Sequence, residues 1–183
     1  MQKNSFTAVS LAGATTVLAS SVFAQDMTGA YAGIAYESTN GGVDNWSELD
    51  LGATPGAGFF LGYNHDFGQF FIGGEVAVSQ SEMSNSSEWF AVDNVIDLKL
   101  KAGTSFGDYA VYGIVSSSSA SWSAYGEYSG NLAGTGFGVG VERQLSDRFS
   151  LGVEYLSRSM GDSDASYDND DITTLALRGI ISF

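Results

Sequence analysis

The sequence lacks cysteine and has a single histidine, a single proline and few basic residues. Without cysteine, the chain forms no disulfide and no thiolate metal site. Only 7 of its 183 residues are lysine or arginine, against 21 acidic residues. The resulting net charge of −14 argues against a nucleic-acid partner, whose phosphates require basic side chains. After the N-terminus, no apolar run reaches the roughly 18 residues of a membrane-spanning helix, and the length predicts one folded domain.

The first 24 residues have the composition of a secretory signal peptide. Lys3 supplies a positive charge, and a mostly apolar stretch with small residues extends from Leu11 to Leu18. Val22, Phe23 and Ala24 then fit a small-residue cleavage site. We therefore predict a signal peptide over residues 1–24 and a mature domain over residues 25–183; the alternative is an amphipathic or buried first helix.

The rest of the chain alternates apolar with small or polar residues, a period of two that predicts β-strands. Four long connections (39–55, 80–91, 117–131 and 159–171) alternate with three short ones (65–69, 104–108 and 145–148). Strands of roughly nine to eleven residues with short turns at one end and long loops at the other are typical of outer-membrane barrels. The predicted strands cover residues 29–38, 56–64, 70–79, 92–103, 109–116, 132–144, 149–158 and 172–183.

The last stretch, Ile172 to Phe183, has an apolar face and ends on an aromatic residue. In an open sheet this would be an unprotected edge that invites aggregation. Pairing with the first strand would remove the edge by closing a barrel. The predicted fold class is thus an all-β, eight-stranded, antiparallel up-and-down transmembrane barrel.

Charged residues on the strands decide which face points inward. A lysine or arginine on the lipid face at mid-bilayer costs about 2–4 kcal/mol, so these residues are expected in the lumen. Their charges nearly balance, which favours a paired internal network that plugs the narrow interior. Strand 109–116 is apolar on both faces, so its orientation stays open. The predicted lumen network is Glu75, Asp97, Lys99, Lys101, Glu142, Glu154, Arg158 and Arg178.

Several short segments resemble the OmpA-like and OmpX-like barrel family, which comprises small eight-stranded outer-membrane proteins of Gram-negative bacteria. The segments are Gly-Gly-Glu-Val at 73–76, Gly-Phe-Gly-Val-Gly-Val-Glu at 136–142, Leu-Ser-Asp-Arg at 145–148, Val-Glu-Tyr at 153–155 and the terminal Phe183. The resemblance covers about residues 29–183 and implies a location in the bacterial outer membrane. It also implies that the last strand is the signal recognised by the barrel-assembly machinery, through Leu177, Ile181 and Phe183.

Catalytic and metal-binding patterns are weak. His65 lies in a predicted short turn and no Ser/His/acid arrangement is readable, so we expect no enzyme and no cofactor. The acidic stretch containing Asp162, Asp164, Asp168 and Asp170 spaces oxygens like part of a calcium loop. It has Tyr167 where such a loop needs glycine and Thr173 where it needs glutamate. We expect a solvated acidic loop there, with a specific metal site as the weaker alternative.

The long connections hold more than half of the acidic residues and no lysine or arginine. Such loops attract divalent cations, which could bridge them to lipopolysaccharide; the alternative is that they only keep the surface soluble. We expect a monomer in contact with outer-membrane lipids and lipopolysaccharide, with a structural or surface-interaction role in the cell envelope, such as envelope integrity or adhesion. A narrow porin-like channel and a soluble, lipocalin-like ligand-binding barrel are the two alternatives.

Overall fold

The computed structural model describes residues 27–43, 49–80, 83–84, 90–124, 128–162 and 170–183. Within these ranges, no helix is long and apolar enough to cross a membrane. The regular elements there are strands, eight of them long and one very short. They are β1 (Gly29–Val43), β2 (Leu49–Asp66), β3 (Phe71–Gln80), β4 (Met83–Ser84), β5 (Phe90–Phe106), β6 (Tyr109–Ala124), β7 (Tyr128–Gln144), β8 (Phe149–Asp162) and β9 (Asp170–Ser182).

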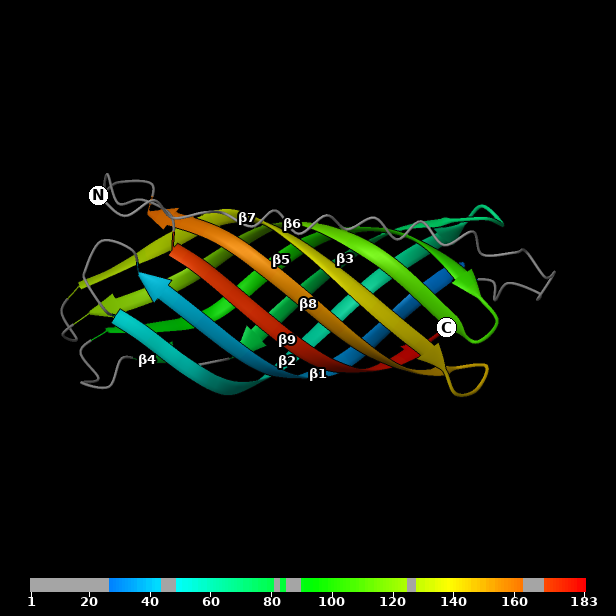
Figure 1. The fold of residues 1–183 in the computed structure, drawn as a ribbon, viewed down its shortest axis with the longest axis horizontal. Helices are drawn as coiled ribbons and strands as arrows, with labels where there is room; N and C mark the ends of the chain where they lie inside the picture. Colours follow the sequence, from blue (N-terminus) through cyan, green and yellow to red (C-terminus); the bar gives the residue numbers. More distant parts are fainter. Residues whose placement is uncertain (1–26, 44–48, 81–82, 85–89, 125–127, 163–169) are drawn as a thin grey trace, which may run out of the picture.

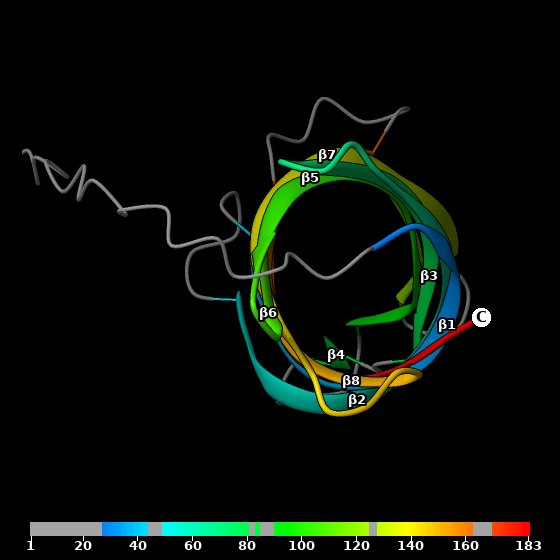
Figure 2. The ribbon, with the colours of Figure 1, turned by 90° about the vertical axis from the view of Figure 1, so that its right-hand side faces the viewer.

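The strands form one antiparallel sheet that closes on itself (Figures 1 and 2). Closure occurs where β1 pairs with β9, from Tyr31 opposite Ser182 to Gly42 opposite Asp171. β3 pairs with β5, and the two-residue β4 pairs further along β5, opposite Ala91 and Val92. The pairing of β5 with β6 shifts register between Asp93 and Val95. The prediction of a closed eight-stranded antiparallel barrel, with the last strand paired to the first, is confirmed.

Apolar side chains cover the outside of the barrel and polar ones gather inside it. Leu100, for example, is 64% exposed and Phe137 is 68% exposed, whereas Arg178 is 1% exposed. This distribution is the reverse of a soluble lipocalin-like barrel, which would hold apolar side chains inside and charges outside. In β6, whose orientation the sequence left open, Tyr112 and Ile114 point inward.

The strands are longer than the sequence predicts at the long-connection end. β6 continues to Ala124 rather than ending near Ser116, and β5 begins at Phe90 rather than Val92. The predicted strands end where the outward-facing residues are no longer apolar. In β6, however, the strand continues through Ser117 and Ser121, whose side chains face outward and are exposed. Backbone pairing needs no apolar face, so the barrel continues beyond its apolar belt.

Glycine shapes two of the short turns at the opposite end of the barrel. Gly107 has φ +58° in the two-residue turn between β5 and β6. Gly68 has φ +87° in the turn after β2, where its backbone N–H donates to Asp66 Oδ1 at 2.6 Å. A positive φ is strained for residues with a Cβ, and glycine therefore permits these tight reversals.

Candidate functional site

Five charged side chains form a central cluster in the lumen. Glu75 lies 2.9 Å from Lys101 Nζ, 3.4 Å from Lys99 Nζ and 2.6 Å from Arg178 Nη2. Glu154 also pairs with Lys99 and Arg178. The side chains come from β3, β5, β8 and β9, so their ion pairs join distant parts of the barrel wall. With three cations and two carboxylates, this central cluster has a formal charge of +1.

A second, neutral group lies around Asp97 and Arg158. Arg158 Nε donates to Asp97 Oδ1 at 2.9 Å, and its Nη2 donates to Oδ2 at 2.5 Å, a bidentate arrangement. Ser118 Oγ donates to Asp97 Oδ1 at 2.6 Å, and Arg158 Nη1 donates to Thr174 Oγ1 at 2.7 Å. Thr39 Oγ1 lies 3.1 Å from Thr174 Oγ1, so the polar contacts extend to β1.

Aromatic rings pack against the central cluster. The Tyr31 hydroxyl donates to Glu75 Oε2 at 2.9 Å, and Lys101 Nζ lies 4.4 Å from the centre of the Tyr31 ring. Arg178 lies 3.8 Å above the Phe60 ring. Such cation–π contacts partly replace the water that the buried cations lose.

Inward-facing glycines provide the space for these rings. A Cβ on Gly140 would overlap the ring of Tyr112, its cross-strand partner, and a Cβ on Gly62 would overlap the ring of Tyr31. A Cβ on Gly136 would lie 3.2 Å from Cγ of Arg158. The glycines of β7 therefore leave room for large interior side chains, as the alternation of that strand suggests.

All eight charged residues assigned to the lumen from the sequence are buried. Seven of them make ion pairs within the two groups described above. Glu142 differs: the described residues give it no hydrogen bond and no ion pair, and its cross-strand neighbours, Ala110 and Gly152, carry no charge. It lies close to the short-turn end of the barrel, beside a cavity.

The sequence analysis did not single out Glu37, Tyr31, Tyr112 or Thr174. Glu37 is 7% exposed, and its Oε2 has no hydrogen-bond partner in the described part of the chain. The signal for this residue was present, because Glu37 alternates with Tyr36 and Ser38 on a strand that already had an outward apolar face. Tyr31 follows the same alternation, so strict use of the period of two would have placed both inside.

The remaining candidate residues lie at the surface or outside the described part of the chain. Leu177 and Phe183 face outward and are exposed, and Ile181 is half-buried on the same face. His65 is exposed near the end of β2, where its ring meets the edge of Phe67. Two aspartates of the suggested calcium loop, Asp164 and Asp168, lie outside the described residues, as do the side chains of the other two, Asp162 and Asp170.

A closed barrel with an apolar exterior and a charged interior defines a membrane-spanning β-barrel protein. The family model "Outer membrane protein beta-barrel domain" matches residues 8–177. The chain belongs to this family and is a protein of the bacterial outer membrane. No curated protein matches it in sequence.

Solved structures support the same fold. Neisserial surface protein A is 15% identical with a TM-score of 0.60, over 85% of this chain and 98% of that one. Ail, the attachment invasion locus protein of Yersinia pestis, is 16% identical with a TM-score of 0.56, over 86% of this chain and 100% of that one. Ail in complex with the heparin analogue sucrose octasulfate is also 16% identical, with a TM-score of 0.55 over the same shares.

Proposed function

We propose that this protein is a non-enzymatic barrel with a role in envelope integrity and surface contact, and that its charged interior acts as a plug. The observation that carries the proposal is the ion-pair network across the lumen. Lys99, Lys101, Arg178, Glu75 and Glu154 are each at most 6% exposed, although they come from four strands. An eight-stranded barrel is only wide enough for its own side chains, so a network of this size fills its cross-section.

Planar-bilayer conductance tests the plug against the alternative of a narrow channel. Purified protein inserted into a bilayer is expected to show no steady current, because ions would have to separate buried ion pairs. Reproducible single-channel steps from pure protein would contradict the plug. A boiled sample of the same preparation serves as the control, because heat unfolds the barrel.

The surface role draws support from the structural neighbours, which include a surface protein and an attachment invasion locus protein. It also agrees with a barrel that continues beyond its apolar belt towards the long connections. Cells that lose this protein are expected to attach less well to a surface or to become more sensitive to detergent. Unchanged attachment and unchanged detergent resistance would together contradict the role.

The acidic long connections support a further proposal about partners. Divalent cations held there would bridge the protein to the phosphates of lipopolysaccharide, since these connections offer no lysine or arginine for direct contact. A chelator is expected to release lipopolysaccharide from the purified monomer. Retention of lipopolysaccharide after chelation would leave the loops with a solubilising role only.

The outward face of the last strand suits recognition by the barrel-assembly machinery. Leu177 is 54% exposed and Phe183, just after β9, is 80% exposed, so both side chains are accessible from outside the barrel. We propose that these two residues and Ile181 form the assembly signal. Its test is given with the other predictions below.

A further inference from the structure

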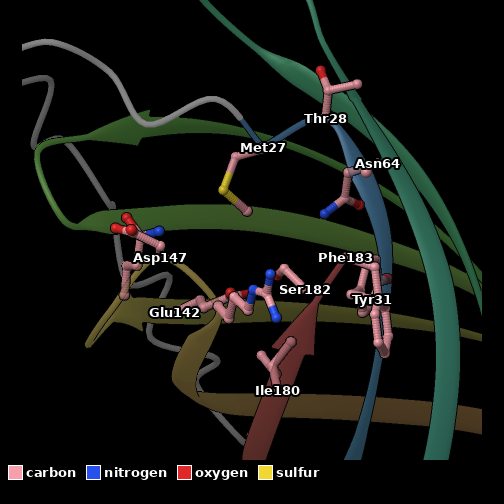
Figure 3. Close-up of a pocket in the computed structure, with 12 residues that line it drawn as sticks. Met27, Thr28, Tyr31, Asn64, Glu142, Asp147, Ile180, Ser182 and Phe183 are labelled. Atoms are coloured by element: carbon pink, nitrogen blue, oxygen red, sulfur yellow. The ribbon is translucent and has the colours of Figure 1, made fainter.

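A cavity of about 390 Å³ lies at the short-turn end of the barrel (Figure 3). Tyr31, whose hydroxyl donates to Glu75 of the central cluster, is part of its wall. Its walls come from β1, β2, β7, β9 and the turn after β7. The segment just before β1 also lines it. Met27 N–H donates to Asp66 Oδ2 at 3.1 Å, and Asp66 N–H donates to Thr28 Oγ1 at 3.0 Å, which fixes this segment to the end of β2. The size is within the range of small-molecule sites.

Glu142 lies in the wall of this cavity and is only 7% exposed. Among the described residues it has no ion pair, whereas Glu75, Asp97 and Glu154 each pair with at least one cation. Its carboxylate has no partner in the described part of the wall and is open to the cavity. A cation bound in the cavity would form an ion pair with it.

Asn64 is a second polar residue in the wall, and it is independent of Glu142 because it comes from β2. Its side chain is 4% exposed, and its Oδ1 has no donor among the described residues. Figure 3 shows the Asn64 side chain directed into the space that Met27 enters from another side. The unpartnered Oδ1 is buried against Gly73, where an added Cβ would overlap it. Rotation of the amide by about 180° exchanges its oxygen and nitrogen, and in that orientation Asn64 would accept a hydrogen bond from a bound donor.

The charges and apolar groups of the wall define the ligand. The wall has two acidic side chains, Glu142 and Asp147, and one basic side chain, Arg148, which favours a cation over an anion. Met27 and Ile180 provide apolar contacts that suit a short hydrocarbon chain. The described residues contain no group of three acidic, histidine or cysteine side chains that could hold a metal ion. We propose that the cavity binds a small organic cation, an aliphatic compound with at least one primary ammonium group, through Glu142 and Asn64.

Isothermal titration calorimetry on the folded barrel in a non-ionic detergent tests this site. The probes are 1,5-diaminopentane, L-lysine, which adds a carboxylate to the same chain, and 1,5-pentanediol, which lacks the charge. The diamine or lysine should bind, and the diol should not. Tighter binding of the diamine identifies a free amine as the ligand class, and tighter binding of lysine identifies an amino acid or peptide. Equal binding of the diol, or no binding of either amine, would overturn the proposal.

Glu142→Gln keeps the shape of the side chain and removes its charge. It should weaken binding of the amine about ten- to a hundredfold, as expected for loss of one charged hydrogen bond. Asp108→Asn is the matched control, because Asp108 is an exposed acid at the same end that does not line the cavity. A heat-dependent shift in gel mobility shows that both variants fold. Unchanged affinity in folded Glu142→Gln, or an equal loss in Asp108→Asn, would show that the amine binds elsewhere.

Discussion

Replacing Glu75 with glutamine tests whether the lumen network stabilises the barrel. The substitution keeps the size of the side chain but removes the charge that faces Lys99, Lys101 and Arg178. Glu154 would then be the only carboxylate in the central cluster, and the formal charge of the cluster would rise from +1 to +2 if all other groups stayed ionised. Lys101 would lose its one ion-pair partner among the described residues, while remaining 3% exposed.

Breaking a buried ion pair by removing one partner costs about 3–5 kcal/mol, because the remaining charge stays buried. We expect a loss of this size in the free energy of unfolding of Glu75→Gln. Urea titration of the barrel in lipid bilayers, followed by tryptophan fluorescence and by gel mobility without boiling, measures it. Glu142→Gln is the internal control, because that carboxylate makes no ion pair with the described residues, and its replacement should change the free energy of unfolding by less than about 1 kcal/mol.

A double variant separates the ion pair from other effects of the glutamine. Adding Lys101→Met to Glu75→Gln removes the stranded cation and should recover part of the lost stability, giving a coupling energy of about 1–3 kcal/mol. If Glu75→Gln unfolds at the same urea concentration as the unmodified protein, the lumen network does not stabilise the barrel. Equal losses for Glu75→Gln and Glu142→Gln would show that burial of the carboxylate, rather than its pairing, determines the result.

Four further predictions concern the wall, the surface and the last strand. Gly140→Ala should destabilise the barrel by about 1–3 kcal/mol in urea titration, because the added Cβ would displace the Tyr112 ring. Gly74→Ala is the control: its added Cβ would have no neighbouring atom within 4 Å, and its stability should be nearly unchanged. Leu100→Arg should cost about 2–4 kcal/mol if this outward position lies at mid-bilayer, and Ser121→Arg, beyond the apolar belt, much less; equal costs would contradict the assigned membrane boundary. Deletion of Phe183 should lower the amount of heat-modifiable protein in the outer membrane while purified protein still folds in detergent; normal assembly in cells would remove it from the assembly signal. Sucrose octasulfate, which is present in a complex of Ail, should bind this protein weakly or not at all by calorimetry, because the four long connections have no basic residue.

The alternation of residue types predicted the inside and the outside of the barrel because each strand position has one of two environments. Leu98 and Leu100 alternate with Lys99 and Lys101, and a charge facing lipid is too costly to allow the opposite arrangement. The ends of strands were harder to predict. Outside the bilayer, outward residues such as Ser121 need not be apolar, so the pattern fades while the backbone pairing continues.

The partners within the lumen could not be predicted in the same way. Glu75 lies opposite Lys99 on the neighbouring strand, and this pair follows from the register between β3 and β5 alone. Its contact with Arg178 depends on how far the closed sheet is staggered, because β3 and β9 are not neighbours. The stagger of a barrel is a property of all its strands together, and no single segment encodes it.

The positions of the basic residues connect the interior with the proposed surface role. After the predicted signal peptide the sequence has six basic residues, of which Lys99, Lys101, Arg158 and Arg178 are buried in the lumen. The other two, Arg143 and Arg148, lie at the short-turn end. The long-connection end therefore offers no lysine or arginine to pair directly with phosphate or sulfate groups. We propose that an anionic partner at that end binds through a bridging cation, and the chelator and sucrose octasulfate experiments both test this proposal.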